Sequence, residues 1–232
     1  KIMTTSGTHT FNMTFDKIIN RAFARCGRSL RTGYDLTSAR DNLNLLFSEW
    51  SNRGIHLWRV KNATTNVVSG TTTYTIPDNG YDVLEAVYRR GSTANTTSQS
   101  DTTMTQISRS EYEAIPNKLA LGTPSQYYVR RNLSNVEINL YLTPNITDDQ
   151  INYFYVARIE DVGKYTNTPD APYRFLPCLV SGLAYYMSQE IAPERADILE
   201  RRYEQELNRA LIEDSQSTSI SLTPMNNYPF GG

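Results

Sequence analysis

Apolar residues near both ends of the chain recur at intervals of three and four, which is the spacing of one face of an α-helix. They form one such face in residues 14–26, and a second stretch begins at about residue 35 or 37 and runs to residue 53. Thr14 can cap the first helix with its hydroxyl, and Gly27 and Gly54 can end the two helices by taking a left-handed conformation. The pattern therefore predicts two amphipathic helices that pack as an antiparallel hairpin.

After Gly54 the pattern changes to an alternation of apolar and polar residues, which is typical of β-strands with one buried face. The clearest example is residues 135–142, where Val136, Ile138, Leu140 and Leu142 share one face. Threonine, whose branched side chain favours strands, is frequent from residue 60 to residue 150 and absent from residues 169–217. The pattern predicts strands at residues 56–60, 63–68, 72–76, 83–90, 102–107, 127–131, 135–142 and 150–159, and one helical turn at 110–115.

Helical spacing returns at Asp170 and continues to Met187 on a broad apolar face, so we expect this helix to be central. Pro177 lies early in the stretch, where it can kink the helix or shift its start. Pro193 breaks the pattern, and a last helix is predicted from there to about residue 214. The remaining residues, 215–232, have no clear helical or strand period and cannot fold alone.

These elements predict an α+β fold. Each of the four helices needs a partner for its apolar face, and the simplest solution packs the N- and C-terminal pairs as one four-helix bundle. The predicted parts are an N-terminal arm (1–13), a helical hairpin (14–54), an inserted antiparallel β domain (55–168), a second helical pair (169–214) and an extended C-terminal arm (215–232). The predicted core of the bundle consists of Phe15, Ile19, Phe23, Leu43, Phe47, Trp50, Leu179, Leu183, Tyr203 and Leu207.

Composition narrows the function. With 39% hydrophobic and 20% charged residues, the chain has the composition of a soluble, folded protein. No segment approaches the run of about 18 apolar residues that spans a membrane, and the polar N-terminal residues show no signal peptide. The 23 basic and 24 acidic residues give a net charge of −1, which disfavours a generic DNA-binding protein that works by neutralising phosphates.

Sequence motifs of enzymes are absent: the chain has no nucleophile elbow, P-loop, dinucleotide-binding glycine motif or zinc-protease motif. His9 and His56 stand alone, and we interpret both as structural or surface residues. Cys26 and Cys178 lie far apart in apolar helical patterns, which is typical of buried, inert thiols and not of a zinc site. We therefore expect no catalytic, cofactor or metal site, although a carboxylate pair of the glycosidase kind stays open because its spacing is spatial.

Charged and aromatic clusters allow two readings. The arginine doublets at residues 89–90, 130–131 and 201–202 fit either solvated edges with ion pairs or a rim that faces a polyanion. Asp148 and Asp149 follow a turn, and we interpret them as solvated. Many of the 16 tyrosines fall in predicted strands or on the third helix. They indicate either an aromatic-rich β core or large surfaces for contact with other proteins.

One long stretch of the chain resembles a known family. FNMTFDKIINRAFARCG at residues 11–27, and ARDNLNLLFSEW at 39–50 followed by Gly54 and Leu57-Trp58, resemble the N-terminal half of tailed-bacteriophage head-to-tail adaptor proteins. Residues 71–77, TTTYTIP, resemble the strand that follows the helices in that family, and residues 173–214 resemble its closing helix pair. The likeness extends both to tail tubular protein A and to the adaptors of short-tailed phages.

The resemblance implies a structural virion protein with no enzymatic activity and no cofactor. Such adaptors form a twelve-fold ring beneath the portal protein, extend the DNA channel, seal the packaged head and provide a platform for the tail nozzle or fibres. The implied partners are the portal protein, further copies of the chain, a tail nozzle or fibre protein, and double-stranded DNA that passes without sequence-specific binding. The protein would be made in the host cytoplasm, would not associate with membrane, and would reside in the tail or connector of the virion until DNA ejection.

The resemblance also gives the C-terminal arm a role, since the arms of such adaptors run along or into the portal. The expected anchors to the portal or a neighbouring subunit are Leu222, Pro224, Met225, Tyr228, Pro229 and Phe230. A segment that becomes ordered only on binding needs a few apolar anchors to bury. Proline helps because it lowers the conformational entropy lost on binding. The alternatives from other classes are a carbohydrate- or receptor-binding β module on a helical scaffold, and a hydrolase of unrecognised geometry.

Overall fold

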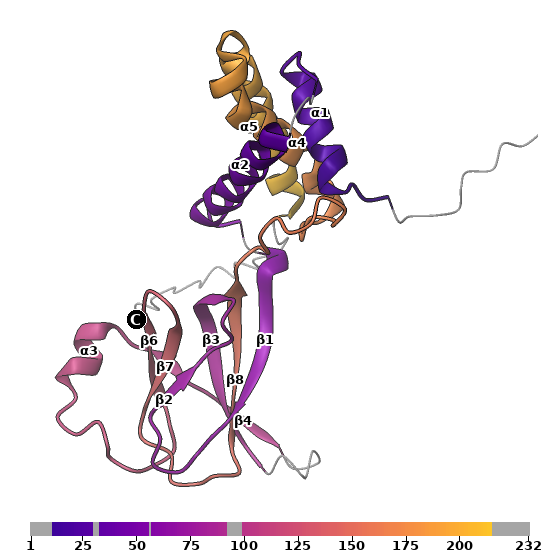
Figure 1. Cartoon of the computed structure of the whole chain (residues 1–232). Coiled ribbons are helices and arrows are strands. Elements are labelled where there is room, and N and C mark those ends of the chain that lie inside the picture. The colour runs from indigo at the N-terminus through magenta and orange to yellow at the C-terminus, as the bar shows by residue number, and fades with distance from the viewer. Residues whose placement is uncertain (1–10, 30–32, 56, 92–98, 215–232) are drawn as a thin grey trace, which may run out of the picture.

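The computed structural model describes residues 11–29, 33–55, 57–91 and 99–214. Within these residues the protein has five α-helices and two β-sheets, which confirms the predicted α+β class. Four long helices gather at one end of the molecule and the strands at the other, as Figure 1 shows. Helices α1 and α2 span Phe15–Arg25 and Gly33–Asn52, α3 is the short helix Arg109–Ala114, and α4 and α5 span Leu176–Ile191 and Ala196–Asp214.

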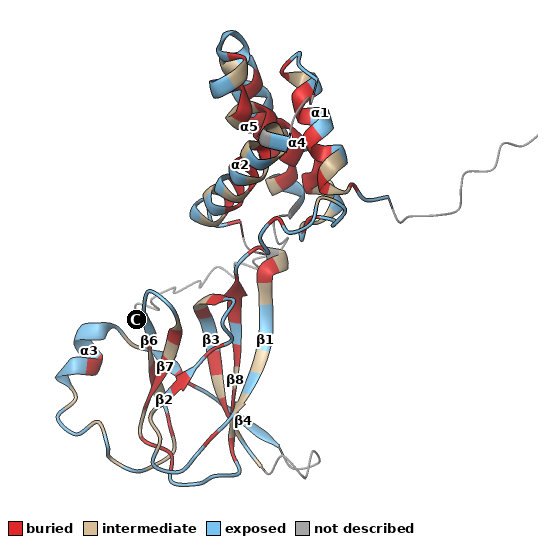
Figure 2. Cartoon of the chain, in the orientation of Figure 1, coloured by how far each residue is buried: buried red, intermediate tan, exposed pale blue. Residues whose placement is uncertain are grey.

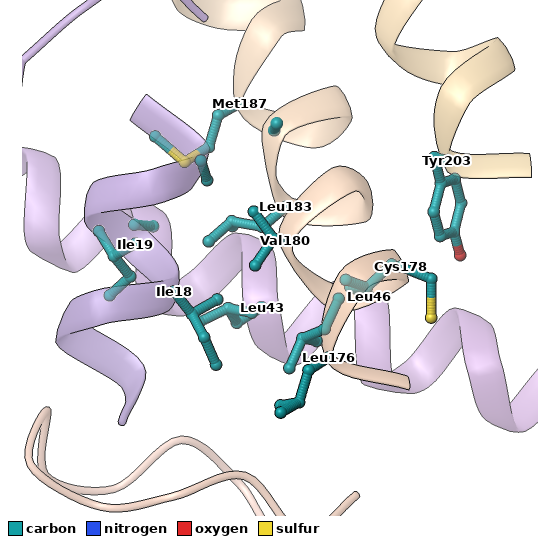
Figure 3. Packing of buried hydrophobic residues seen from close by; sticks show 14 of the residues in the cluster. Ile18, Ile19, Leu43, Leu46, Leu176, Cys178, Val180, Leu183, Met187 and Tyr203 are labelled. Carbon is teal, nitrogen blue, oxygen red and sulfur yellow. The ribbon is translucent and has the colours of Figure 1, made fainter. Parts of the chain in front are cut away.

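Helix α4 is the centre of the helical part. It is apolar on nearly all sides, and α1, α2 and α5 each pack against it. Figure 3 shows side chains of α1, α2 and α4 meeting in this cluster, with Tyr203 of α5 on the other side of α4. Gly182 lets the helices approach closely, because a Cβ atom there would lie 2.9 Å from atoms of both Leu46 and Tyr203. A helix that is apolar all round must be buried by neighbours, which explains why the chain surrounds α4.

The start of α1 is capped by a distant segment of the chain and not by the neighbouring residue that the sequence predicts. The side chain of Thr14 makes no capping hydrogen bond to the helix backbone. Instead, the amides of Phe15 and Asp16 donate to the carbonyl oxygens of Asn167 and Tyr165, at 2.9 and 3.0 Å. The loop before α4 thus satisfies the start of α1. At the other end, Gly27 takes the expected left-handed conformation with φ of 74°.

The start of α4 also differs from the prediction. A 3₁₀ turn at Tyr173–Phe175 precedes the helix, so α4 begins at Leu176. Pro177 then falls in the first turn, where its missing amide hydrogen costs nothing because that group has no helical acceptor. A second 3₁₀ turn at Pro193–Arg195 leads into α5.

The strands form two four-stranded sheets that face each other. One sheet has the order β1-β8-β3-β4, from strands Val60–Asn66, Gln150–Ala157, Gly80–Arg90 and Ser100–Thr103. The other has the order β2-β7-β6-β5, from strands Thr73–Thr75, Val136–Tyr141, Gln126–Arg131 and Thr105–Gln106. Their inner faces share one hydrophobic cluster that includes Tyr88, Tyr127, Ile138 and Tyr153, and Figure 2 shows buried segments of the strands in red.

Three strand predictions need correction. In the predicted strand 56–60 a 3₁₀ turn occupies Leu57–Arg59, and β1 starts at Val60 and runs on to Asn66 as one strand. The predicted strand 102–107 is divided between β4 and β5, because the chain leaves one sheet for the other at the buried Met104. Finally, β5 pairs with β6 in parallel, whereas the other strand pairs are antiparallel.

Two hydrophobic clusters, one among the helices and one between the sheets, show where the chain passes from one part to the other. Ile55 lies with the helices, as does the stretch after β8, where Ile159 and Val162 are 7% and 5% exposed. By packing, the chain therefore leaves the helical cluster after Trp58, which is partly buried against it, and re-enters it near residue 159. The two crossings lie side by side, because Val60 pairs with Val156.

We expect Trp50→Ala to lower the free energy of unfolding by about 3–5 kcal/mol, the usual range for emptying a large aromatic core site. Trp50 is fully buried, lies against Phe47 and Phe175, and donates a hydrogen bond to the Tyr203 hydroxyl at 2.9 Å. Leu45→Ala is the control, because Leu45 lies on the same helix but is 57% exposed. Urea denaturation that gave equal stability for both variants would contradict the role of Trp50.

We also expect the helical part to fold without the sheets. Replacing residues 60–157 with a short Gly-Ser linker keeps Ile159 and Val162, and it joins ends that are strand neighbours. The product should be soluble, with a helical circular dichroism spectrum and cooperative unfolding. A matched variant that lacks residues 60–165 also loses those two apolar residues and Tyr165, which supplies one of the two carbonyls that cap α1, so it should be less stable. A random-coil spectrum from the first variant would mean that the two parts depend on each other to fold.

Candidate functional site

The place where the helices join the sheets is the most distinctive site in the described chain. Helix α2 ends at Asn52, Gly54 turns the backbone with φ of 73°, and the chain enters β1 through the 3₁₀ turn. Strand β8 returns beside β1 and leads back to the helices. Both crossings lie between the two parts of Figure 1, so the contacts made here set how the parts are held together.

Arg59 connects the two crossings. Its side chain is 1% exposed, and its Nε donates a hydrogen bond to the carbonyl oxygen of Ala157, at the end of β8, at 2.8 Å. Its Nη1 donates to the carbonyl oxygen of Ile55 at 2.9 Å and to the Ser51 hydroxyl at 3.2 Å. Its guanidinium also lies over the ring of Tyr81 from β3, 5.2 Å from the centroid. One side chain therefore binds the end of α2, the end of β8 and the start of β3.

The electrostatics of Arg59 explain why these contacts matter. Desolvation lowers the pKa of its guanidinium, while Tyr81 acts in the opposite direction. Arginine stays charged even when buried, so the cost of burial is offset by the oxygens that accept from Nε and Nη1 and by the Tyr81 ring. Its Nη2 is buried with no hydrogen-bond partner among the described residues. Sequence reasoning missed this residue, because a single arginine within His-Leu-Trp-Arg-Val has no pattern that distinguishes it from a surface arginine.

A small pocket lies beside this junction. Its volume is about 280 Å³, and its lining residues come from α2, β3 and the stretch after β8: Asn44, Phe47, Ser48, Ser51, Tyr81, Arg158, Ile159 and Asp161. The side chain of Asn44 accepts a hydrogen bond from the backbone amide of Val162 at 3.0 Å, which adds another link between α2 and the returning chain. The lining contains no cysteine or histidine, and its two serines lie on α2.

A polar network ties the helices to one another. Trp50 donates to the Tyr203 hydroxyl, and the hydroxyls of Tyr203 and Tyr186 both donate to Glu49 Oε2 at 3.1 Å. Burial, and then the Glu49 carboxylate, raise the pKa of Tyr186 to about 12, so this phenol keeps its proton at neutral pH. Arg53 pairs with Glu49 and, at 2.6 Å, with Glu204. These contacts join α2, α4 and α5.

A second network lies between α1, α4 and α5. The Arg25 guanidinium donates to the hydroxyl of the buried Ser181, which in turn donates to the Glu206 carboxylate. Glu206 also pairs with Arg202 at 3.0 Å. Desolvation lowers the pKa of Arg25, and Glu206 opposes that shift. Both networks are satisfied inside the helical part and offer no free nucleophile.

The structure can be compared with the residues that the sequence singled out. All ten predicted core residues are at most 5% exposed and belong to one cluster around α4. The six predicted arm anchors lie outside the described residues, as do His9 and His56. Cys26 and Cys178 are buried, and burial raises the pKa of the Cys178 thiol to about 12.

One prediction about the acidic turn was wrong. Asp148 is exposed, but Asp149 is 5% exposed and accepts a hydrogen bond from the Gly91 amide. Its backbone carbonyl also accepts from the amide of Val67 at 2.8 Å. The side chain therefore packs at the end of the sandwich, where it raises the pKa of Tyr88 in addition to the effect of burial. The sequence shows only two consecutive acids after a turn, and nothing in it separates the buried one from the solvated one.

The arginine doublets of the strands are largely paired with acids. Arg89 binds Asp101 at 2.7 Å, Arg131 binds Asp82 at 2.7 Å, and the Arg130 guanidinium lies 3.9 Å from Glu137. This supports the reading of edges with ion pairs for the strand doublets. In the doublet at residues 201–202, Arg202 pairs with Glu206 at 3.0 Å, whereas Arg201 donates a hydrogen bond to the backbone oxygen of Asp197.

The tyrosines divide between the two readings. Most of those in the strands are buried, among them Tyr74, Tyr88, Tyr127 and Tyr153, so they form an aromatic β core. Tyr173 is the opposite case, since it is 76% exposed beside the start of α4. Tryptophans offer little to a carbohydrate ligand: Trp50 is buried, and the partly buried Trp58 packs on Phe175 with centroids 4.5 Å apart.

The described residues place no three His, Cys, Asp or Glu side chains where they could hold a metal ion together. Over the same part of the chain, every helix is too short or too polar to cross a lipid bilayer. The contacts at the junction are hydrogen bonds and packing, and they link the helices to the sheets.

Comparison with known proteins gives one match. The family model described as SU10 adaptor protein matches residues 13–227, which covers all the helices and both sheets. It confirms the resemblance to phage head-to-tail adaptors that the N-terminal helices suggested. A search of curated proteins gave no match.

We expect Arg59→Met to destabilise the protein by about 2–4 kcal/mol, because it removes the donors to two buried backbone carbonyls. The control is Arg158→Met, since Arg158 is an exposed arginine of the same junction and should change stability by less than about 0.5 kcal/mol. Urea denaturation measures both. Similar small effects from the two substitutions would show that Arg59 does not hold the junction.

Proposed function

Since the chain belongs to the SU10 adaptor protein family, we propose that it forms a ring below the portal of a tailed bacteriophage and joins the head to the tail. In this proposal twelve copies surround the channel, extend it beyond the portal, and seal the head after packaging. The lower side of the ring is a platform for the tail nozzle or fibres. The observation that carries the proposal is the family match, which extends over both the helices and the sheets.

The fold suggests a division of work between the two parts. We propose that α1, α2, α4 and α5 act as one four-helix bundle, from residues 14–54 and 169–214, with residues 55–168 as an inserted β domain. Each part has its own hydrophobic cluster, so each can present a surface without distorting the other. Arg59 and the paired crossings would then keep the bundle and the insertion at a constant angle when force passes through the ring.

The charge balance agrees with a channel that DNA must leave. A net charge of −1 gives little general attraction for phosphates, so a ring of such chains would let the genome slide during ejection. Two of the strand arginines are held in close ion pairs with acids, which reduces their attraction further. The protein would therefore contact double-stranded DNA without recognising its sequence.

The C-terminal arm supplies the contact to the portal in this proposal. Residues 215–232 contain no Lys, Arg, Asp or Glu, but they contain aromatic, aliphatic and proline residues. Such a segment gains free energy only by burying its anchors on another surface. In an adaptor, that surface would belong to the portal protein or to a neighbouring subunit of the ring.

We expect deletion of residues 222–232 to leave the melting temperature unchanged and to weaken binding to purified portal protein. Tyr228→Ala with Phe230→Ala should reproduce part of this loss, at about 1–2 kcal/mol for each well-packed anchor. A pull-down on portal measures binding, and Asn226→Ala with Asn227→Ala is the matched control within the same segment.

Equal portal occupancy by the full and shortened chains would remove the arm from the proposal. A lower melting temperature after deletion would show that the arm packs on its own subunit.

A further inference from the structure

Helix α5 has an exposed ridge on the side away from α4. Ile198, Gln205 and Ile212 recur at every seventh residue, and the two isoleucines are 63% and 64% exposed. Arg201 and Arg209 flank this line, and both are exposed. All of these side chains except Ile212 line a shallow groove of about 540 Å³, which Arg202 and Glu206 complete. We call Ile198, Arg201, Gln205, Arg209 and Ile212 the α5 ridge.

The α5 ridge itself contains no acidic residue. Glu206 lies at its border, but its side chain is only 16% exposed and is already held by Arg25, Arg202 and Ser181. The one hydrogen bond of Arg201 within the described chain goes from Nε to the backbone oxygen of Asp197, which leaves the rest of its guanidinium facing outward. The ridge is therefore basic and partly apolar, and it would suit a surface that is acidic and partly apolar.

Helix α2 carries a surface of that kind. Its exposed ridge consists of Thr37, Asp41, Leu45, Ser48 and Asn52, which follow one another at intervals of three and four. We call these residues the α2 ridge. Its one acid is Asp41, whose carboxylate lies 4.0 Å from Nε of the neighbouring Arg40, and its centre is Leu45, which is 57% exposed. Glu190 adds a second carboxylate nearby, because the Ser38 hydroxyl donates to it at 3.1 Å.

These two ridges hold all the large exposed apolar side chains of the long helices in the described chain. Leu45 lies on α2, and Ile198 and Ile212 lie on α5, whereas α1 and α4 have none. Single exposed apolar residues are common on protein surfaces, so it is their combination with the opposite charge of the two ridges that points to an interface. The two ridges differ in charge sign, and both point away from α4, so one copy cannot bring its own ridges together.

We propose that the α5 ridge of one copy packs against the α2 ridge of the next copy. The inference rests on the proposed ring and names the surfaces that build it. Because the two ridges are different surfaces, the contact is head-to-tail, and such contacts close into rings when the rotation per subunit permits. Leu45 then packs between the exposed isoleucines, and Arg201 or Arg209 faces Asp41.

Cysteine cross-linking tests the contact directly. One chain carries Leu45→Cys and a second, differently tagged chain carries Gln205→Cys, which places one thiol at the centre of each ridge. The two are mixed on purified portal protein and treated with a short bismaleimide. The wild-type chain is the control, because its two cysteines are buried and burial raises the pKa of both thiols.

The proposal predicts a cross-linked dimer that contains both tags, and little dimer from either chain alone. A chain with both substitutions should give a ladder of oligomers up to the size of the ring. Dimers between two copies of the same single variant would overturn the head-to-tail arrangement. Portal-bound chains that give no link between positions 45 and 205 would overturn the contact and leave the proposed function intact.

If the chain does not bind portal, the proposed function fails. The contact is then tested with the free doubly substituted chain at high concentration. A ladder of cross-linked oligomers supports the contact, and the absence of a ladder overturns it.

Charge reversal provides an independent measure. Arg201→Glu with Arg209→Glu in the Gln205→Cys chain should lower the yield of mixed dimer about tenfold, because like charges then face each other. Adding Asp41→Lys to the Leu45→Cys chain should restore much of that yield. Reversal of Arg130 in the sheet, far from either ridge, should leave the yield unchanged. A yield that ignores both the reversal and the rescue would contradict the pairing of the two ridges.

Discussion

The rest of this structure depends on the burial of α4. This helix is apolar on nearly every side, and water on any of its faces would be costly, so it must be surrounded. Two of the covering helices precede the sheets in the chain, and α5 follows them. Burial of one helix thus holds together segments that are more than a hundred residues apart. The sheets between them form an insertion whose two connections to the helices lie side by side. Gly182 makes this possible, since a side chain there would meet Leu46 and Tyr203.

The inserted sheets have their own hydrophobic core, and the junction lies between that core and the core of the helices. The sandwich is closed by tyrosines and aliphatic residues from both sheets, whereas the crossings are held by backbone carbonyls gathered around Arg59. A guanidinium suits this position because it donates in several directions at fixed angles. For a protein of the SU10 adaptor family, such a joint provides a constant relation between two surfaces, each of which can contact a different neighbour. The adaptor role then follows from the geometry of surfaces, and no reactive group is needed.

Much of the fold could be predicted from the sequence because its elements are amphipathic, and period alone separates the helices from the strands. The clearest case is β7, where Val136, Ile138 and Leu140 alternate as expected and are all buried. What failed depends on contacts distant in sequence. The cap of α1 comes from Tyr165 and Asn167, and the division of residues 102–107 depends on a second sheet that no local pattern reveals. Arg59 and Asp149 are buried charged residues in segments that read as a strand start and a solvated turn, because burial of a polar side chain is decided by its neighbours in space.

The central claim is that copies of this chain assemble on a portal, and the mass of that assembly tests it most directly. Mass photometry of purified portal, before and after addition of the chain, measures the number of copies bound. The account predicts one discrete increase equal to twelve chains of 26.4 kDa, with no intermediate populations once the chain is in excess. A portal whose mass does not change, or that takes up a variable and unsaturated number of chains, would contradict it.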